Sequence, residues 1–325
     1  MGKKILVTGG AGFIGSHLCE QLVAKKHQVI CLDNLFSGSK KNLTTIINNP
    51  HFRFVKGDVR QKELVDKLVA EVDMIYHLAA IVGVSVVVNQ PLENIDVNFF
   101  GIRNITESAY KHGKKKVLFT SSSEVYGKNS LVPLVENLSD QVFGGTNVTR
   151  WAYGEAKALG EHLLYAYAEK GLPFAVVRYF NCYGPRGINP NYANVVPKFI
   201  GQALKNEVIT IHESGRATRC FCYVDDTVQG TILAGEKLNR DVVNIGSNKE
   251  ISILDLAKKI IGASGSQSKI THLNEQKIFS KKYESSQRRV PSVLKAEKLL
   301  GFKPKTSLNQ GLTKTITWTR NQISK

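Results

Sequence analysis

The sequence of 325 residues is poor in the features that mark secreted and membrane proteins. Its five cysteines form no pair of Cys-x-x-Cys motifs, and its eight histidines show no metal-ligand spacing. No apolar run approaches the roughly 18 residues that a membrane-spanning helix needs. The N-terminal residues resemble the start of a strand and not a signal peptide. We therefore expect reduced thiols, a cytoplasmic protein, no contact with a membrane and no structural metal.

Acidic residues are also scarce. The chain has 27 of them against 44 lysines and arginines, which gives a net charge of +17 at neutral pH. A positive excess of this kind occurs in nucleic-acid-binding proteins. Here the lysines are scattered, and no basic stripe is interleaved with aromatic residues. We therefore expect no nucleic-acid partner and interpret the charge as a solvated surface that attracts an anionic substrate.

What the chain does contain is a regular alternation of short apolar strands and longer helical segments. Strands that are apolar on both faces are typical of a parallel sheet covered by helices on both sides. The pattern therefore predicts an α/β fold of the Rossmann type with a doubly wound parallel sheet. The predicted strands are 4–8, 28–32, 52–56, 74–78, 117–121 and 174–179, and the predicted helices between them are 13–26, 62–69, 94–112 and 152–170.

The pattern changes near residue 180, where a loop rich in Gly, Pro and Asn begins. We predict a nucleotide-binding Rossmann domain over residues 1–180 and a smaller C-terminal substrate-binding lobe over residues 181–325. Whether the chain crosses between the two parts more than once stays open. The elements predicted in the second part are helices at 195–205, 225–237, 254–263 and 308–323 and strands at 208–212 and 242–245.

A glycine-rich turn joins the first predicted strand to the first predicted helix, in Thr8-Gly-Gly-Ala-Gly-Phe-Ile-Gly15. Its glycines permit a tight turn and let the backbone approach a pyrophosphate at the helix N-terminus. Asp33 ends the second strand, where a carboxylate binds the adenosine ribose hydroxyls and disfavours a 2′-phosphate. The sequence therefore predicts NAD as the cofactor. The residues expected to bind it are Gly9, Gly12, Phe13, Ile14, Gly15, Asp33, Asn34, Asp58, Val59, Leu78, Ala79, Ala80, Asn98 and Lys157.

Two of these positions have a specific interpretation. Asp58 follows the third predicted strand, so its carboxylate can accept a hydrogen bond from the adenine amino group or cap the next helix. The fourth strand ends in His77-Leu-Ala-Ala80, whose small residues let a cofactor lie against the backbone. We assign His77 no chemical role.

Tyr153 and Lys157 lie four residues apart in the helix predicted at 152–170, so both side chains lie on one face. A free phenol has a pKa of about 10, which is too high for a base at neutral pH. A nearby ammonium group lowers that pKa, and an oxidised nicotinamide adds a second positive charge. The pair therefore predicts a base that removes a proton from an alcohol while a hydride leaves its carbon.

Further polar residues follow the fifth and sixth predicted strands, at the sheet edge that faces the ligand crevice. Glu124 follows three serines in Thr120-Ser-Ser-Ser-Glu124, and a carboxylate is costly in such an apolar setting unless it has a task. Asn181 can donate to a phosphate or sugar oxygen. Arg186 is either a phosphate clamp or part of a surface ion pair. Arg219 and Arg289 are candidates for bidentate contacts with a diphosphate.

Together these motifs resemble those of the extended short-chain dehydrogenase/reductase family of nucleotide-sugar epimerases, dehydratases and decarboxylases. The resemblance spans residues 3 to about 320. It implies tightly held NAD, a UDP- or dTDP-sugar substrate in the C-terminal lobe, and a homodimer. It implies Ser122 as the hydroxyl partner of a ketone oxygen, Tyr153 as the base and Lys157 as its electrostatic helper. It also implies that Asn181, Arg219 and Arg289 lie on the diphosphate side.

The residues after Ser122 distinguish the reactions within this family. Ser123-Glu124, with an arginine before Val290-Pro291, resembles the UDP-glucuronate decarboxylases. In such enzymes oxidation at sugar C4 creates a β-keto acid that loses carbon dioxide, Ser122 and Tyr153 stabilise the enolate, and Glu124 is expected to manage the proton at C5. We therefore favour UDP-glucuronate decarboxylation. The alternatives are 4-epimerisation of UDP-glucose or another UDP-hexose, 4,6-dehydration of a UDP- or dTDP-hexose, and a non-catalytic NAD-binding regulator.

Overall fold

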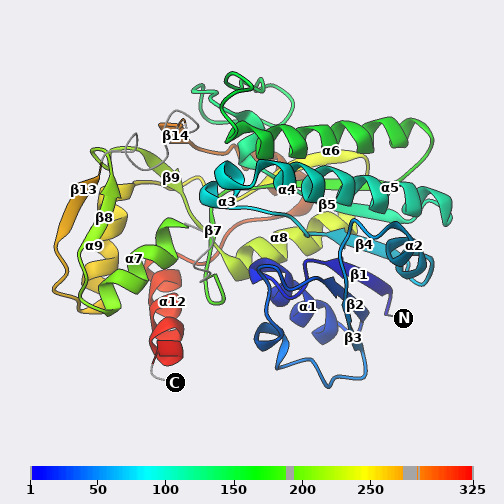
Figure 1. Ribbon diagram of the computed structural model, residues 1–325, viewed down its shortest axis with the longest axis horizontal. Helices are drawn as coiled ribbons and strands as arrows, with labels where there is room; N and C mark the ends of the chain where they lie inside the picture. The colour runs from blue at the N-terminus through cyan, green and yellow to red at the C-terminus, as the bar shows by residue number, and fades with distance from the viewer. Residues whose placement is uncertain (1, 188–193, 274–283, 285, 324–325) are drawn as a thin grey trace.

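The computed structural model describes residues 2–187, 194–273, 284 and 286–323. Its centre is a seven-stranded sheet in the order β11-β6-β5-β4-β1-β2-β3 (Figure 1). All its neighbouring strands pair in parallel. The strands are β1 (Lys4–Thr8), β2 (Gln28–Asp33), β3 (Phe52–Lys56), β4 (Met74–His77), β5 (Lys116–Ser122), β6 (Phe174–Tyr179) and β11 (Asp241–Ile245). This doubly wound sheet confirms the predicted fold class.

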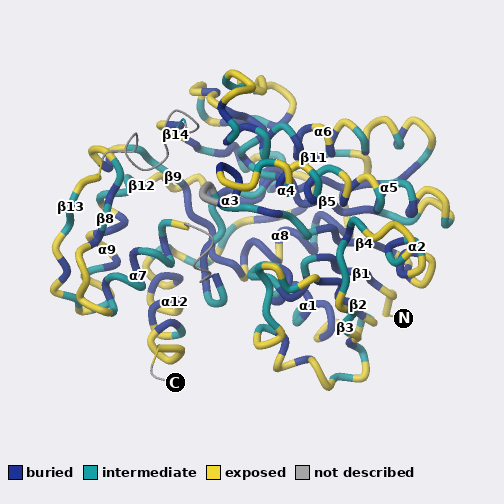
Figure 2. Tube along the Cα trace, in the orientation of Figure 1, coloured by how far each residue is buried: buried dark blue, intermediate teal, exposed yellow. Residues whose placement is uncertain are grey.

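Helices cover both faces of the sheet because successive strand residues point to opposite sides. In β1, Val7 belongs to one apolar core and Leu6 to the other. The first core includes residues of α1 (Phe13–Ala24) and α8 (Val224–Lys237). The second includes residues of α2 (Lys62–Ala70), α5 (Gly101–Lys111) and α6 (Trp151–Glu169). Figure 2 shows the buried residues concentrated along the strands between these helix layers.

The segment between β4 and α5 differs from the prediction. A short helix, α3 (Val84–Asn89), follows Gly83, and the helix predicted at 94–112 is three consecutive pieces. These are α4 (Pro91–Ile95), a π-helical turn η2 (Asp96–Phe100) and α5. Residues 84–88 contain four valines, which have low helix propensity and show no helical period. The helix therefore forms there without a local signal.

The second half of the chain contributes to both parts of the molecule. β11 pairs with β6 in the main sheet, and α8 packs on the same sheet. The remaining elements form a smaller lobe, on the left in Figure 1. Its strands are β7 (Cys182–Tyr183), β8 (Ile209–His212), β9 (Thr218–Cys220), β10 (Cys222–Tyr223), β12 (Glu250–Ser252), β13 (Ile270–Leu273) and β14 (Arg288–Arg289); its helices are α7 (Val195–Leu204), α9 (Ile253–Ser264) and α12 (Leu308–Ile323), while α11 (Leu294–Leu300) packs against α8 and β11.

Two short 3-10 turns complete the described elements. η1 (Lys40–Leu43) follows β2, and η3 (Ser123–Tyr126) follows β5. The five cysteines are all free thiols. No helix in the described part of the chain is both long enough and apolar enough to cross a bilayer.

Candidate active site

The glycine turn between β1 and α1 leaves no room for side chains. Gly9 has φ +71°, and a Cβ added there would lie 2.7 Å from the Ala79 nitrogen. A Cβ added at Gly15 would lie 2.1 Å from the Gly9 carbonyl oxygen. Gly12 precedes the helix and supplies no side-chain cap. The helix N-terminus therefore presents backbone N–H groups to a ligand, as a pyrophosphate site requires.

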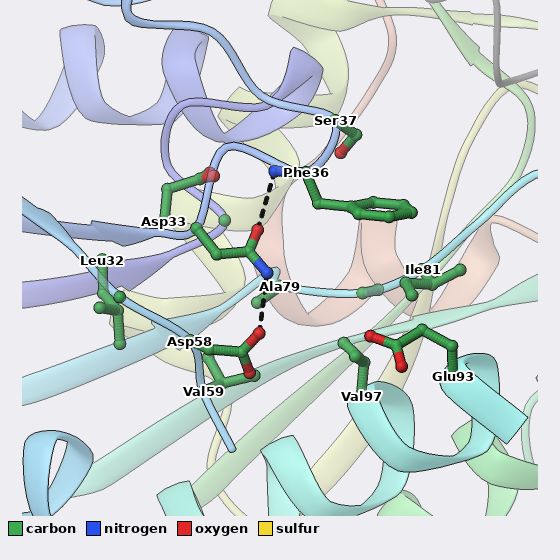
Figure 3. A pocket seen from close by; sticks show the side chains of 14 residues that line it. Leu32, Asp33, Phe36, Ser37, Asp58, Val59, Ala79, Ile81, Glu93 and Val97 are labelled. Atoms are coloured by element: carbon green, nitrogen blue, oxygen red, sulfur yellow. Dashed lines mark hydrogen bonds between the residues drawn. The ribbon is translucent and has the colours of Figure 1, made fainter. Parts of the chain in front are cut away.

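A cavity opens beside this turn at the carboxyl ends of β1 to β4 (Figure 3). It brings together many of the residues that were predicted to bind the cofactor. It also includes side chains on the loop after β2 and on α4 and η2, which no sequence motif marks. The lining residues are Gly9, Leu32, Asp33, Asn34, Phe36, Ser37, Gly57, Asp58, Val59, Ala79, Ala80, Ile81, Glu93 and Val97.

Two carboxylates in this cavity are held in different ways. Asp33 accepts hydrogen bonds from the backbone N–H groups of Ala11 (2.9 Å) and Leu35 (2.8 Å), while burial raises its pKa. Asp58 is partly buried, but its hydrogen bonds with Arg60 and Asn34 hold its pKa below the usual range. The Asn34 amide donates to Asp58 over 2.8 Å (Figure 3). Both carboxylates line the cavity, and their contacts with the ribose and the base of NAD stay predictions.

The structure distinguishes the two interpretations of Asp58 only in part. It is not the N-cap of α2, since that helix begins at Lys62 after Gln61. Its Oδ1 does accept from the backbone N–H of Arg60, so it orders the turn before the helix. A contact with adenine stays a prediction.

Other predicted cofactor residues lie around the cavity without lining it. Asn98 is fully buried, and its amide donates to the carbonyl oxygens of Ile81 and Asn94, both over 2.9 Å. It therefore fixes the backbone after β4. The residues Gly12, Phe13, Ile14 and Gly15 form the start of α1, and Leu78 continues β4 through a backbone bond to Thr8.

Tyr153 and Lys157 lie on α6, one turn apart. The Lys157 side chain is 1% exposed, and its Nζ donates to the Thr120 carbonyl oxygen over 3.0 Å. The same nitrogen lies 5.9 Å from the centroid of the Tyr153 ring. Burial lowers the pKa of Lys157 to about 7, although Glu161 opposes the shift. The ammonium and the phenol are therefore close enough for the charge of one to act on the other.

Ser122 ends β5, directly before the turn η3 that packs against α6. Its hydroxyl accepts from the Glu124 backbone N–H over 3.2 Å. A Cβ added at Gly154 would lie 2.6 Å from the Glu124 carbonyl oxygen, so only glycine lets α6 approach this turn. Ser123 is buried beside it. The structure therefore brings Ser122, the predicted hydroxyl partner, close to Tyr153, because the turn after Ser122 packs against Gly154.

Glu124 forms ion pairs with two arginines from distant parts of the chain. The Arg150 guanidinium lies 3.1 Å from one carboxylate oxygen, and Arg289 donates to the other. Both arginines are buried, with 7% and 3% of their surface exposed. Despite burial, Arg150, Arg289 and Arg219 lower the pKa of Glu124 to about 2. Glu124 is therefore an anion at neutral pH and has no proton to donate.

Sequence reasoning missed Arg150. Arg150 lies three residues before Tyr153, a spacing that places both side chains on the same side of a helix. This spacing could have identified it. Arg289 was expected at a diphosphate, and here its guanidinium contacts Glu124 and the Gly127 carbonyl oxygen. A contact with phosphate stays a prediction for Arg289.

The remaining polar candidates divide between two places. Asn181 donates to the Cys220 carbonyl oxygen over 3.1 Å, and Arg219 donates to the backbone of Ser286 over 2.7 Å. Arg219 also pairs in register with Arg289 across β9 and β14, so these residues lie close together. Arg186 instead forms an ion pair with Glu20 on α1 over 2.7 Å. Of its two interpretations, the structure shows the ion pair.

Residues 5–246 match the model of the NAD dependent epimerase/dehydratase family. The chain belongs to this family. UDP-N-acetyl-alpha-D-glucosaminuronate decarboxylase from Bacillus cytotoxicus is 42% identical over 98% of both chains. UDP-glucuronic acid decarboxylase 1 of Xenopus tropicalis is 37% identical over 99% of this chain and 73% of its own. The solved UDP-glucose 4-epimerase of Thermotoga maritima, with UDP-glucose, has a TM-score of 0.89 and 31% identity, and covers 98% of this chain and 99% of its own.

Membership in the epimerase/dehydratase family confirms NAD as the cofactor. It also confirms an enzyme and excludes the non-catalytic regulator, since the matching relatives are named as decarboxylases and epimerases. The glycine cradle and the partly shielded Asp33 carboxylate fit a dinucleotide. The roles of the individual side chains stay predictions.

Proposed function

We propose that this enzyme decarboxylates a UDP-linked uronic acid through transient oxidation at sugar C4. The cluster of Glu124, Arg150 and Arg289 beside Ser122 carries the proposal. One carboxylate meets two buried guanidinium groups, which leaves this cluster with a net positive charge. Guanidinium groups bind carboxylates through paired hydrogen bonds. A sugar with a carboxylate at C5 gains this interaction, whereas a neutral hexose does not.

The names of the relatives support the same reaction, and their sequence identities indicate which sugar to test first. The relative at 42% identity is named for UDP-N-acetyl-glucosaminuronate, and those at 37% and 36% are named for UDP-glucuronate. The higher identity favours the N-acetylated sugar, and UDP-glucuronate remains the second substrate to test. The two differ at C2, whereas the proposed chemistry takes place at C4 and C5.

The proposed chemistry assigns a task to each side chain. NAD, when bound, accepts a hydride from C4 and later returns it. Tyr153 removes the C4 hydroxyl proton, and the Lys157 ammonium stabilises the phenolate. The Ser122 hydroxyl donates to the developing C4 oxygen. With a ketone at C4, the bond between C5 and its carboxylate breaks and carbon dioxide leaves. The electron pair forms an enolate, whose oxygen Ser122 and Tyr153 stabilise. A proton from solvent water adds at C5 and restores the C4 ketone, which the returning hydride and the proton held by Tyr153 convert to the alcohol.

The charge state of Glu124 changes its proposed task. With a pKa of about 2 it is ionised throughout the neutral range. We therefore assign it to orienting Arg150 and Arg289 around the substrate carboxylate, in place of the expected management of the C5 proton. In this arrangement the arginines contact both carboxylates, one from the protein and one from the sugar.

The alternative reaction is 4-epimerisation, supported by the close match to the solved Thermotoga epimerase. Mass spectrometry detects the loss of carbon dioxide or water, and proton NMR of the sugar distinguishes inversion at C4 from no reaction. The holoenzyme is incubated in turn with UDP-N-acetylglucosaminuronate, UDP-glucuronate, UDP-glucose and dTDP-glucose. We expect the loss of carbon dioxide from at least one uronate. An unchanged mass with an inverted C4 would show epimerisation, and the loss of water would show dehydration. Either result without loss of carbon dioxide rejects our proposal.

We further propose a homodimer. Large apolar side chains are exposed on the adjacent helices α5 and α6: Tyr110, Leu159 and Tyr165, with exposed fractions of 36%, 49% and 40%. Exposed apolar side chains on two adjacent helices offer a surface for a second subunit. Light scattering after gel filtration tests this, and Leu159→Lys should shift the mass to that of a monomer.

The free thiols favour a reducing compartment such as the cytoplasm.

A further inference from the structure

An acidic residue, Glu161, continues the row formed by Tyr153 and Lys157 on α6. Glu161 lies four residues beyond Lys157, so the three side chains share one face of the helix. Only 4% of Glu161 is exposed. A carboxylate at such a depth is costly unless several donors compensate its charge. Its partners therefore show what the residue does.

Donors from two strands hold the Glu161 carboxylate. Its Oε1 accepts from the Ser121 hydroxyl over 2.5 Å and from the Arg178 Nε over 3.0 Å. Its Oε2 accepts from a terminal nitrogen of Arg178 over 2.6 Å. Arg178 is itself fixed, because its other terminal nitrogen donates to the Glu136 carbonyl oxygen and its guanidinium lies 4.8 Å from the Tyr126 ring. The paired contact leaves the carboxylate little freedom to turn.

These contacts fix the part of β5 that enters the active site. Ser121 lies between Thr120, whose carbonyl oxygen accepts from Lys157, and Ser122, the predicted partner of the C4 oxygen. Ser121 also pairs in register with Arg178 of β6. The helix therefore contacts the end of β5 at two successive residues, once through Lys157 and once through Glu161. Both contacts determine how far Ser122 lies from Tyr153.

We propose that Glu161 is a positioning residue for the oxidation at sugar C4. Clamped by Ser121 and Arg178, it holds the end of β5 against α6 so that Ser122, Tyr153 and Lys157 keep a productive spacing. The inference rests on the proposed function only for the choice of substrate in the assay, because oxidation at C4 precedes both decarboxylation and epimerisation.

Electrostatics gives Glu161 a second effect on the same site. Burial lowers the pKa of Lys157 and Glu161 raises it. Among the residues that the structure describes, Tyr153 on α6 and His77 on β4 also face Lys157, and burial keeps His77 neutral with a pKa of about 3. Without the Glu161 charge, Arg178 would stand uncompensated nearby. Both changes favour neutral Lys157. Lys157 lies one helical turn from Tyr153 and Glu161 lies two turns away, so we expect the lost ammonium charge to outweigh the direct effect of the lost carboxylate on the phenol.

A purely structural ion pair would behave differently. Buried pairs of this kind add little stability over apolar side chains of the same volume, although the loss of one partner is costly. A test must therefore separate a loss of stability from a loss of geometry and charge at the site. Leu164 offers a matched control, since it is fully buried on the same helix and belongs to the apolar core beneath it.

The experiment compares Glu161→Gln with Leu164→Ala, both as NAD-loaded enzymes. We expect Glu161→Gln to lower kcat by about tenfold to a hundredfold with little change in KM. We also expect its alkaline limit of activity to move to lower pH. Leu164→Ala should lower Tm at least as much and leave both kcat and the pH profile close to those of the unaltered enzyme. Equal loss of kcat in the two variants, with unchanged pH profiles, overturns the proposal.

A second variant and a second readout keep the test decisive. Ser121→Ala replaces Glu161→Gln in the test if Glu161→Gln fails to fold. It removes one donor to the Glu161 carboxylate, so it should also lower kcat, but by less. The ultraviolet difference between each enzyme and its Tyr153→Phe form reports the phenolate without any substrate. We expect Glu161→Gln to raise the pH at which the phenolate appears. This readout holds even if the enzyme does not act on a uronate, and an unmoved phenolate titration with unchanged kcat rejects the role of Glu161.

Discussion

Glu124 and Arg289 lie 165 residues apart in the sequence, yet their side chains form an ion pair. The contact joins η3, which follows the central strand β5, to β14 of the smaller lobe. The same carboxylate also holds Arg150 at the start of α6. One acidic side chain therefore links three segments of the chain: η3, the start of α6, and β14.

Loss of Arg289 should weaken the handling of uronic acids. Arg289→Met leaves Glu124 with Arg150 and removes one of two guanidinium groups from the cluster. We expect kcat/KM for the uronate to fall by about tenfold to a hundredfold, as for a lost charge-assisted hydrogen bond. Steady-state kinetics on the preferred uronate measures the effect.

The neighbouring arginine is the control for this prediction. Arg288 pairs with Glu250 on the surface, and its side chain is 53% exposed. Exposed ion pairs contribute little, so Arg288→Met should change neither kcat/KM nor Tm appreciably. If the two variants have similar kinetics, Arg289 has no specific role at the substrate.

Removal of the Tyr153 hydroxyl should stop turnover and leave cofactor binding intact. Tyr153→Phe keeps the ring and removes the base, so we expect kcat to fall by about 10²-fold or more. The NAD content released on denaturation should match that of the unaltered enzyme. A near-normal kcat would contradict the assignment of the base.

The buried ammonium group of Lys157 should lower the free energy of unfolding, by an amount that depends on pH. Its pKa falls from 10.5 to about 7 on folding, mainly through burial. Between these values the unfolded chain binds the proton that the folded chain has lost, so stability rises with pH through this window. Below pH 7 both states are protonated and the full cost of the buried ammonium remains.

Replacement of Lys157 should show this cost directly. Lys157→Met should abolish activity and raise the free energy of unfolding of the cofactor-free enzyme at about pH 6.5, by on the order of 2 kcal/mol. The gain should shrink as the pH rises toward 9. Denaturant unfolding at the two pH values measures it. A gain that grows with pH would contradict the lowered pKa.

The main sheet was predictable because its strands are apolar on both faces and therefore leave a strong local pattern. Every strand predicted within the first 180 residues begins and ends within one residue of the observed strand. The closing helix at 308–323 has the predicted bounds for a similar reason, since one apolar face repeats along it. The glycine turn was equally readable because its motif lies between such a strand and a helix.

The charged cluster was not predictable from local pattern. Arg289 lies in β14, a strand of two residues that pairs with β9, and it contacts Glu124 across 165 residues of sequence. Such a short strand leaves no periodicity in the sequence. For Glu161 the spacing was visible, but its partners Ser121 and Arg178 come from two other strands. Contacts between distant segments, and the pKa values that depend on them, required the structure.

Two glycines in helices should respond oppositely to alanine. A Cβ at Gly15 would lie 2.1 Å from the Gly9 carbonyl oxygen, whereas a Cβ at Gly262 on α9 has nothing within 4 Å. Gly15→Ala must therefore displace the turn that is predicted to bind the pyrophosphate, and we expect NAD to be lost from the purified enzyme. Gly262→Ala should keep its NAD and gain about 0.5–1 kcal/mol from helix propensity. Cofactor content and thermal unfolding measure the two effects, and full NAD occupancy in Gly15→Ala would show that this turn does not bind the dinucleotide.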